Sequence, residues 1–394
     1  MLPQADLIYQ IFICSSRKHG FATTANMWIR LHGHLGSTRP IGLPRGRNLI
    51  TIRNTNLGLL SAIQVGHDNA GPTPKLFVEF IIIYNSVTGH LYMFPCCRWI
   101  GRGIEDDALE RVLVGHLVRM SPNDPKLIFT AVAADPGDGV CKLPNRCQSP
   151  AAYRRSFESR NASPMNIHEQ VANAVNRLLK HFCKPGRQNA SSLTWLWCGQ
   201  NGLVPCLGLV FNYGFRSNRL FQRRIYVWDY LERVADLFAS ELGLTGPPQS
   251  TPPSPKPNSP ATTRLCSSPA LYQLPQHEVS GTLSAAYSAL QANRLCVVTM
   301  RQSAIDFVTH VHQVARLGSS LGKEGRFNLL MCRGLREHSL VQWFSLLAVS
   351  PVTSQMYENK SFFLNHDLRR AIQQLLTALD EFELPMEPVL LRET

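Results

Sequence analysis

The residues that most constrain the fold of this chain lie between Ile63 and Gly101, where short apolar stretches alternate with turn-forming sequences. Val78 to Tyr84 is mostly β-branched and aromatic, and it is bounded by Gly71-Pro72 on one side and Asn85-Ser86 on the other. Such stretches favour extended strands joined by tight turns. Gly71 is expected to take a positive φ, because glycine lacks the Cβ that makes this conformation costly. The sequence therefore predicts strands and turns in this region.

The same pattern covers the chain from Ala25 to about Ala133. The apolar run from Leu7 to Ile13 predicts one more strand, because it is too short to cross a bilayer and no basic segment precedes it. Many short strands with turns between them indicate a β-sandwich. Apolar pieces separated by Gly and Pro predict its strands at Met27 to Leu31, Leu49 to Arg53, Leu60 to Val65, Leu76 to Tyr84 and His90 to Phe94.

A helical pattern follows a polar stretch. Residues Asp135 to Ser163 are rich in Pro, Gly, Asn, Ser and Arg, which predicts a linker. We expect Asn166 to cap the next helix together with Glu169, and Lys184-Pro185-Gly186 to end it. The apolar stripe of this helix has spacings of three and four residues and consists of Ile167, Val171, Val175, Leu178 and Phe182.

Further apolar stripes predict more helices. Helical signals resume near Ser284, after a Pro/Ser/Thr-rich insert at residues 246–281 that is expected to be extended and solvated. A plain spacer and a ligand for SH3-type domains both fit the composition of the insert. Trp195, Trp197, Trp228 and Trp343 are expected in the helical core. The two clearest stripes consist of Val227, Leu231, Val234, Phe238 and Leu242, and of Leu368, Ile372, Leu375, Leu376, Leu379 and Phe382.

The net charge of +13 over 394 residues narrows the class of partner. Basic residues exceed acidic ones in every part of the chain but form no long basic arm, which argues against nucleic acid. A diffuse basic surface suits anionic lipid headgroups or an acidic protein surface. A soluble surface that merely carries basic residues fits as well. The densest basic cluster consists of Arg216, Arg219, Arg223 and Arg224.

No set of residues suited to catalysis is recognisable. The eleven cysteines form no paired CxxC framework, which favours reduced thiols, and Cys141 and Cys147 lack the further ligands that zinc needs. Because no Gly-x-Ser-x-Gly motif occurs, a serine lipase has no visible nucleophile. His67 and Asp68 are interpreted as a turn, since a third partner for acid–base chemistry is missing.

Two other candidates are interpreted as structural. The run from Gly318 to Glu324 superficially resembles a phosphate-binding loop, but only three residues separate its glycines and Glu324 stands where Ser or Thr would hold magnesium. Gly322 and Gly325 are therefore expected to form a turn between helices. We expect no catalytic residue, no cofactor and no metal site. The histidine pairs that lack a third ligand are His32 with His34 and His310 with His312.

Two parts of the chain resemble known domains. Ile63 to Gly101, including Gly89 to Phe94, resembles the second half of a PLAT domain, a β-sandwich that holds proteins against membranes or other proteins. The helical part resembles a RUN domain, an all-helical module that typically contacts small GTPases or trafficking adaptors. The blocks that carry this second resemblance are Ser192 to Gly199, Gly214 to Phe221, Val227 to Glu232, Gly322 to Phe327, Trp343 to Ala348 and Met356 to Glu358.

A PLAT domain followed by a RUN domain is the layout of the DENN domain-containing protein 5 family of Rab-interacting proteins. Asp106 to Val114 is also similar to that family. In the family, a DENN exchange module and a first RUN domain lie upstream, so the resemblance assigns no nucleotide exchange to the residues present here. Two departures are Leu76, where the PLAT pattern favours Trp, and the proline-rich insert within the RUN region.

The expected fold is a multidomain β + α arrangement, with an antiparallel PLAT/LH2-type β-sandwich followed by an all-α RUN helical bundle. We expect an N-terminal strand or linker at 1–24, the PLAT domain at 25–133, a linker at 134–163 and the RUN domain at 164–391. The insert at 246–281 is expected to interrupt the RUN domain.

The resemblance implies a non-catalytic interaction arm of a Rab regulator in Golgi and endosomal traffic, in the cytoplasm and peripheral on those membranes. Its expected partners are a Rab-family small GTPase, a sorting adaptor such as a sorting nexin, and a membrane surface. A lipid-modifying enzyme that docks through PLAT, like some lipoxygenases and lipases, is an alternative, and so is a pure lipid-binding module. Partner binding is expected at Arg216, Arg219, Arg223, Arg224, Lys323 and Arg326.

Overall fold

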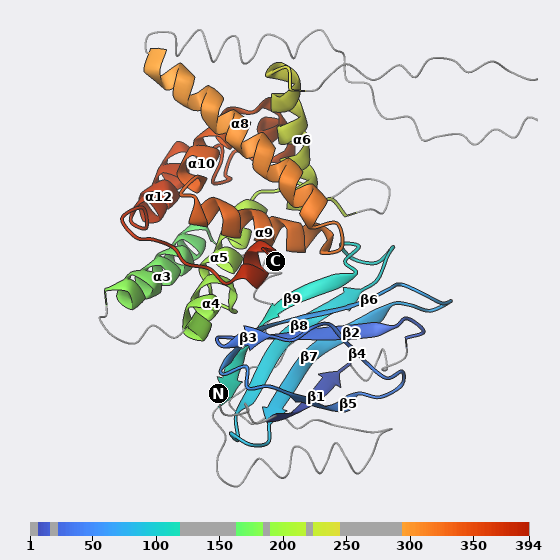
Figure 1. Cartoon of the computed structure of the whole chain (residues 1–394). Coiled ribbons are helices and arrows are strands. Elements are labelled where there is room, and N and C mark those ends of the chain that lie inside the picture. The colour runs from blue at the N-terminus through green and yellow to red at the C-terminus, as the bar shows by residue number, and fades with distance from the viewer. Residues whose placement is uncertain are drawn as a thin grey trace, which may run out of the picture.

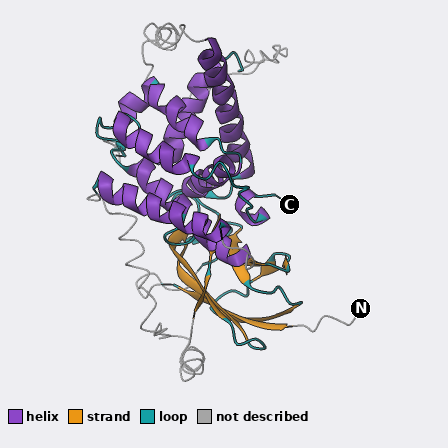
Figure 2. Cartoon of the chain, turned by 90° about the vertical axis from the view of Figure 1, so that its left-hand side faces the viewer, coloured by secondary structure: helices purple, strands orange, loops and turns teal. Residues whose placement is uncertain are grey.

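The computed structural model describes residues 7–15, 23–118, 163–183, 190–217, 224–244 and 294–393. Its N-terminal part is a β-sandwich and its C-terminal part is a helical bundle, and the two stack against each other (Figures 1 and 2). This arrangement confirms the expected fold. Within these residues, no helix is both long and apolar enough to cross a membrane.

The sandwich consists of two antiparallel sheets. One sheet has the order β10-β8-β7-β1-β5, and the other has the order β3-β2-β6-β9 with β4 beside β2. All five strands that the sequence predicts between Met27 and Phe94 are present. The strands are β1 (Leu7–Cys14), β2 (Met27–Gly33), β3 (Gly36–Ser37), β4 (Ile41–Gly42), β5 (Leu49–Asn54), β6 (Leu60–His67), β7 (Leu76–Asn85), β8 (Leu91–Ile100), β9 (Glu110–Val114) and β10 (His116–Val118).

Strand β1 occupies an interior position in its sheet. It pairs with β7 on one side and β5 on the other, so that Ile11 faces Ile83 and Ile50 across the ladder. The strand expected from Leu7 to Ile13 is therefore confirmed. The sheet begins before residue 25, where the sandwich was expected to start, because the short N-terminal strand pairs with both of these later strands.

The sandwich core follows from the two-residue period of its strands. Ile11, Ile29, Ile63, Ile81 and Phe94 are fully buried between the sheets. Leu76, which replaces the Trp of the PLAT pattern, also lies in this core at 1% exposure. The expected turn after β6 is present too, and Gly71 has a φ of +84°.

The helical domain confirms the predicted stripes. Ile167, Val171 and Val175 are buried on one face of α3, and Leu231 and Val234 are buried on one face of α6. The helices are α3 (Pro164–Phe182), α4 (Ala190–Cys198), α5 (Leu203–Asn212), α6 (Val227–Glu241), α8 (Arg294–Leu317), α9 (Gly322–Arg336), α10 (Leu340–Val349), α11 (Pro351–Met356), α12 (His366–Thr377) and α13 (Pro388–Leu391).

The ends of two helices differ from the expectation. Ser163, not Asn166, caps α3, because its hydroxyl accepts a hydrogen bond from the amide of Asn166 at 3.2 Å. Helix α12 ends at Thr377, so the last two members of its predicted stripe, Leu379 and Phe382, follow the helix. They still pack into the core, since Leu379 is 1% exposed and Phe382 stacks on Phe182 at 5.3 Å.

Several predictions concern parts of the chain outside the described residues. They are the linker up to residue 162, the helix end at Lys184-Pro185-Gly186, the insert at 246–281, the helix onset near Ser284, and the thiols of Cys141 and Cys147.

Aromatic side chains fill the centre of the helical domain. The rings of Phe211 and Phe363 lie 5.0 Å apart, and Tyr357 lies 5.0 Å from both Phe363 and Tyr230. Tyr357 donates its hydroxyl to the carbonyl of Phe211 at 2.7 Å, so its polar group is satisfied although it is buried. The expected core tryptophans Trp197, Trp228 and Trp343 are at most 2% exposed, whereas Trp195 is only partly buried.

Replacing Phe363 with alanine should destabilise the protein strongly. The ring is 0% exposed and contacts four other aromatic rings, so its removal leaves a cavity. We expect the free energy of unfolding to fall by about 3–5 kcal/mol. Urea unfolding followed by far-ultraviolet circular dichroism measures this loss. Arg370→Ala, at an exposed position of α12, is the control and should change stability by less than about 0.5 kcal/mol. Equal losses in both variants would contradict the expectation.

Candidate functional site

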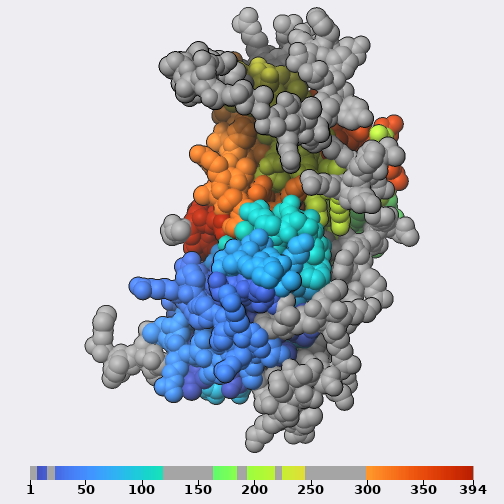
Figure 3. All heavy atoms as spheres, turned by 90° about the vertical axis from the view of Figure 1, so that its right-hand side faces the viewer, coloured from blue at the N-terminus to red at the C-terminus, as the bar shows by residue number. Residues whose placement is uncertain are grey.

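The two domains meet at the outer face of one sheet of the sandwich. Side chains of β6 and β9 alternate between the sandwich core and the face turned toward the helices. Ala62 and Val114 belong to the buried cluster of the helical domain, whereas their neighbours Ile63 and Leu113 belong to the sandwich core. In the space-filling view, cyan strand residues lie directly beneath the orange C-terminal helices (Figure 3). The domains therefore share a continuous apolar contact.

A carboxylate of the sandwich caps a helix of the other domain. Asp106 lies in the loop between β8 and β9 and is only 1% exposed. Its carbonyl oxygen accepts a hydrogen bond from the amide of Lys323 at 3.1 Å, and its Oδ2 accepts one from the amide of Glu324 at 3.2 Å. These amides belong to the first turn of α9, where no partner is available within the helix. The negative charge of Asp106 also interacts favourably with the dipole of α9.

Arg111 on β9 holds the same carboxylate from the sandwich side. Its Nη2 lies 2.6 Å from Oδ1 of Asp106, and its Nη1 lies 3.4 Å from Oδ2. It also donates to the carbonyl of Trp99. Burial opposes the charge of Arg111, but Asp106 holds the pKa of this guanidinium above its usual range. Because both groups are buried, removing one would leave an uncompensated charge.

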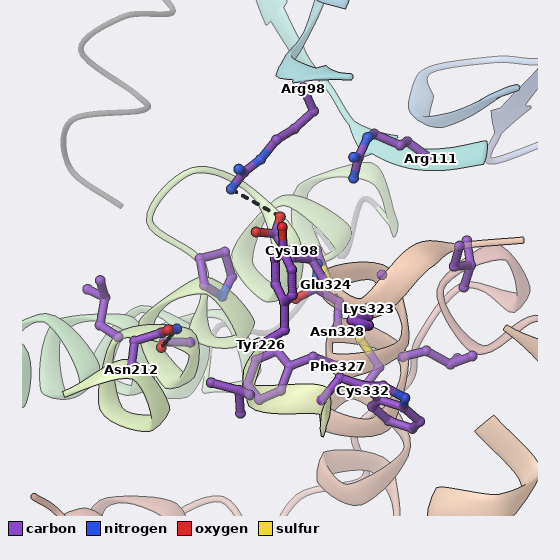
Figure 4. A pocket seen from close by; sticks show the side chains of 18 of the residues that line it. Arg98, Arg111, Cys198, Asn212, Tyr226, Lys323, Glu324, Phe327, Asn328 and Cys332 are labelled. Atoms are coloured by element: carbon purple, nitrogen blue, oxygen red, sulfur yellow. Dashed lines mark hydrogen bonds and ion pairs between the residues drawn. The ribbon is translucent and has the colours of Figure 1, made fainter. Parts of the chain in front are cut away.

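A second ion pair crosses between the domains nearby. Nη2 of Arg98 on β8 lies 3.0 Å from Oε2 of Glu324 on α9, and Figure 4 shows this pair as a dashed line. Burial raises the pKa of Glu324, while the positive charge of Arg98 opposes that rise. The first turn of α9 thus contacts two residues of the sandwich. The backbone amides of this turn donate to Asp106, and the side chain of Glu324 pairs with Arg98.

The close approach at the start of α9 requires a glycine. Gly322 has a φ of +70°, which side chains rarely adopt. A Cβ atom at this position would lie 2.7 Å from both the carbonyl oxygen and Oδ2 of Asp106. The expected turn between helices is confirmed at Gly322, which follows the end of α8. Gly325 lies inside α9, so the expectation that it belongs to the turn is wrong.

The C-terminal residues also join the two domains. Glu387 accepts hydrogen bonds from the hydroxyl of Ser61 on β6 at 2.5 Å and from Thr194 on α4 at 2.8 Å. Arg392 forms an ion pair with Glu110 on β9. The segment from Glu387 to Arg392 therefore contacts the sandwich and the helical bundle at the same time.

A cleft of ≈ 1230 Å³ lies between the docked domains. Strands β8 and β9 line it on one side, and α5, α9 and the start of α6 line it on the other. Figure 4 shows Arg98 and Arg111 reaching in from the strands, opposite Tyr226, Glu324 and Phe327 from the helical domain. Because residues of both domains form its walls, the cleft depends on the way the domains dock.

Two of the predicted partner-binding residues are exposed at this cleft. Arg216 and Arg224 both line it, and both side chains are largely accessible to solvent. Arg216 donates to the carbonyl of Gln355 at 3.4 Å. The guanidinium of Arg224 lies over the ring of Tyr226, 5.3 Å from its centre. Among the described residues, neither arginine forms an ion pair.

The other predicted residues differ in their surroundings. Lys323 lines the cleft, but its Nζ lies 2.7 Å from Oδ1 of Asp229. Arg326 lies 3.7 Å from Glu232 and donates to the carbonyl of Gly318 at 3.0 Å. These two side chains tie α9 to α6 within the helical domain, so their charges are partly neutralised. Arg219 and Arg223 lie outside the described residues.

The histidines considered as metal ligands have other partners. Within the part of the chain that the structure describes, no three His, Cys, Asp or Glu side chains gather closely enough to hold a metal ion. His67 and Asp68 form hydrogen bonds within the turn after β6, as expected. The partners of the histidine pairs are Gln64 for His32, the amide of Leu59 for His34, Glu337 for His310 and Asp236 for His312.

Sequence reasoning missed the residues that dock the two domains. In the sequence, Asp106 stands out only as part of the family-like stretch from Asp106 to Val114, and Glu324 only as part of the loop from Gly318 to Glu324. Arg98 is only one residue of the β-rich run from Ile63 to Gly101. One signal was available, because Arg98 stands in the strongly apolar stretch of β8, where a charge needs a partner. The identity of that partner was not accessible, since Glu324 is far away in the sequence.

Removing the Asp106 carboxylate should destabilise the docked domains. Asp106→Ala leaves Arg111 buried without its partner and uncaps α9, so the free energy of unfolding should fall by about 3–5 kcal/mol. Urea unfolding measures the loss. Glu383→Gln, which removes an exposed carboxylate, is the control and should alter stability by less than about 0.5 kcal/mol. A stability of Asp106→Ala equal to that of the control would show that the interface does not depend on this group.

The stability of the protein should depend on the protonation of His32. Burial lowers the pKa of His32 from 6.5 to about 4, so the folded protein holds this imidazole neutral where the unfolded chain protonates it. The contribution of His32 is fully present above pH 6.5 and is lost as the pH falls toward 4, by up to about 3 kcal/mol. His32→Gln should flatten this part of the stability profile in urea unfolding, and exposed His366→Gln should not. Identical profiles for all three proteins would refute the assignment.

Comparison with known proteins agrees with the two-domain structure. The RUN domain family matches residues 170–387, more than half of the chain, and the PLAT/LH2 domain family matches residues 9–114. Mouse Lipoxygenase homology domain-containing protein 1 is 30% identical over 119 residues, which cover 27% of this chain and 6% of the relative. Human Polycystin-1-like protein 3 is 27% identical over 122 residues, which cover 28% and 7%. The chain thus spans only a small part of these relatives.

Matching solved structures include coral 8R-lipoxygenase, with 21% identity, a TM-score of 0.24 and coverage of 44% of this chain and 29% of that chain. A calcium-dependent 11R-lipoxygenase matches with 20% identity, a TM-score of 0.22 and coverage of 32% and 21%. The family matches, in contrast, fall on the two domains seen in the structure. The chain therefore belongs to the RUN domain family and carries a PLAT/LH2 domain before its RUN domain.

Proposed function

We propose that this chain is a non-catalytic interaction arm that binds a small GTPase or a sorting adaptor, and that also binds a membrane surface. PLAT and RUN are interaction domains; RUN domains bind small GTPases and PLAT domains bind membranes. The observation that carries the proposal is the docking of the two domains by Asp106, which fixes two exposed arginines, Arg216 and Arg224, beside the sandwich.

The specific role that we propose is that of a Rab regulator of the DENN domain-containing protein 5 kind. The order of the two domains and the motif from Asp106 to Val114 support this role. Nucleotide exchange in that family belongs to a DENN module, so we assign only binding to the PLAT and RUN domains. The proposed place of action is the cytoplasmic face of Golgi and endosomal membranes.

The proposed contact is electrostatic. Arg216, Arg219, Arg223 and Arg224 would face acidic surface on a GTP-loaded Rab or on a sorting adaptor such as a sorting nexin. Charges at the rim of an interface mainly increase the association rate and make binding sensitive to salt. Lys323 and Arg326 contribute less in this proposal, because Asp229 and Glu232 already pair with them.

A pure lipid-binding module is the second candidate. The net charge of +13 favours it, because anionic headgroups attract a basic surface. A lipid-modifying enzyme of the lipoxygenase type has less support, since no metal-ligand cluster occurs among the described residues. Flotation with anionic vesicles, set beside GTPase capture, separates these functions.

Capture of Rab proteins by the full chain tests the proposal. We expect a Rab loaded with a non-hydrolysable GTP analogue to be retained more strongly than the same Rab loaded with GDP. The double variant Arg219→Glu and Arg223→Glu should reduce capture about tenfold at low salt, because it reverses charge at the proposed contact.

The matched control for this capture experiment is Arg301→Glu, which reverses an exposed charge on α8. It should capture Rab as the unchanged protein does, and circular dichroism should be the same for all variants. Capture that ignores the bound nucleotide would remove the GTPase function and favour the lipid-binding candidate.

A further inference from the structure

We propose that the cleft between the PLAT and RUN domains binds an extended acidic peptide that carries apolar side chains, contributed by a partner protein. The site is composite, because β8 and β9 of the sandwich form one wall and helices of the RUN domain form the other. This inference deepens the proposed interaction function and rests on it, since it names the chemical form of the segment that the chain recognises.

The size of the cleft suits a peptide better than a small molecule. Its volume of ≈ 1230 Å³ exceeds the ~300–1,000 Å³ typical of small-molecule pockets. Its lining includes Arg98 and Arg111 on the strands as well as Arg216 and Lys360 of the helical domain. A chain segment in extended form can follow such a length while its side chains reach both walls.

The charge of the cleft selects an acidic occupant. Carboxylates of the protein already pair with most of the basic groups, for example Glu324 with Arg98 and Asp106 with Arg111. Arg216 and Arg224 are exposed, and no described residue forms an ion pair with either. Seven basic residues line the cleft against two acidic ones, namely Arg98, Arg111, Arg216, Arg224, Lys323, Lys360 and Arg392 against Glu324 and Glu358.

The remaining surface of the cleft selects apolar side chains. Apolar residues of both domains line it, among them Val112, Leu209, Phe215 and Ile225.

A folded protein surface or a lipid headgroup fits these observations less well. A flat protein surface would reach the exposed arginines but not the half-buried apolar residues Val112 and Phe215 in the wall of the cleft. A headgroup would pair with Arg216 and Arg224 but would leave the apolar wall beside Val112 and Phe215 uncovered. A peptide that alternates acidic and apolar residues satisfies both kinds of group.

The test is fluorescence anisotropy with the full chain and a fluorescein-labelled peptide in which Asp or Glu alternates with Leu or Phe. We expect saturable binding, and loss of binding for the same peptide with Asn and Gln in place of the acids. Arg216→Glu combined with Arg224→Glu should weaken binding about tenfold at low salt. Arg53→Glu, at an exposed position on β5 and outside the cleft lining, is the matched control and should bind normally.

Hydrogen exchange gives an independent readout of the composite site. Bound peptide should protect amides of β9 (Glu110–Val114) and of the residues around Ile225 together. Protection in one domain only would overturn the composite site. Equal binding by the charge-reversed variant and the control would overturn the proposal, and so would binding to phosphatidylserine vesicles without any binding to the peptide.

GTPase capture distinguishes failure of this inference from failure of the proposed function. If GTP-loaded Rab is captured while the acidic peptide does not bind, the peptide site is wrong and the GTPase function stands. If the peptide binds with the expected dependence on Arg216 and Arg224 while no Rab is captured, the inference is supported and the GTPase partner is wrong.

Discussion

The structure of this chain depends on one buried carboxylate at the boundary of two domains. Asp106 is held by Arg111 on its own sandwich and accepts hydrogen bonds from the first amides of α9 in the RUN domain. A buried ion pair contributes little net stability by itself, but it penalises every arrangement in which one partner is left alone. The main effect of the pair is therefore to favour one relative orientation of the two domains. Because Gly322 has no side chain, the start of α9 can come close to Asp106.

That orientation determines the surface available to partners. The strands β8 and β9 face α9 and the start of α6, and the hydrogen bonds between the loop before β9 and α9 help to hold this arrangement. A PLAT domain connected to the RUN domain by the chain alone would present separate surfaces. Here the arginines of one domain lie opposite the strands of the other, so recognition is a property of the pair of domains.

Much of the fold could be predicted from the sequence, because periodicity reports which face of an element is buried. The β-branched stretch of β7 and the stripes of α3 and α6 are examples. The cap of α3 was misassigned because Ser and Asn are both good capping residues, although Pro164 directly after Ser163 favours the serine. The start of the sandwich was placed too late because β1 finds its neighbours β5 and β7 only in the folded protein.

The candidate site was less accessible from sequence, since a basic residue does not show whether a distant acid pairs with it. In the sequence, Lys323 and Arg326 are indistinguishable from Arg216 and Arg224 as basic residues, yet α6 supplies carboxylates to the first two only. The docking residues Arg98 and Glu324 were missed for the same reason, because each is informative only beside the other.

The position of Glu387 has a practical consequence for experiments in cells. Its two carboxylate oxygens contact β6 and α4, and Arg392 follows a few residues later at β9. A bulky fluorescent reporter attached close to Arg392 would lie against both domains and would compete with those contacts. A long flexible spacer between Arg392 and the reporter would leave them undisturbed.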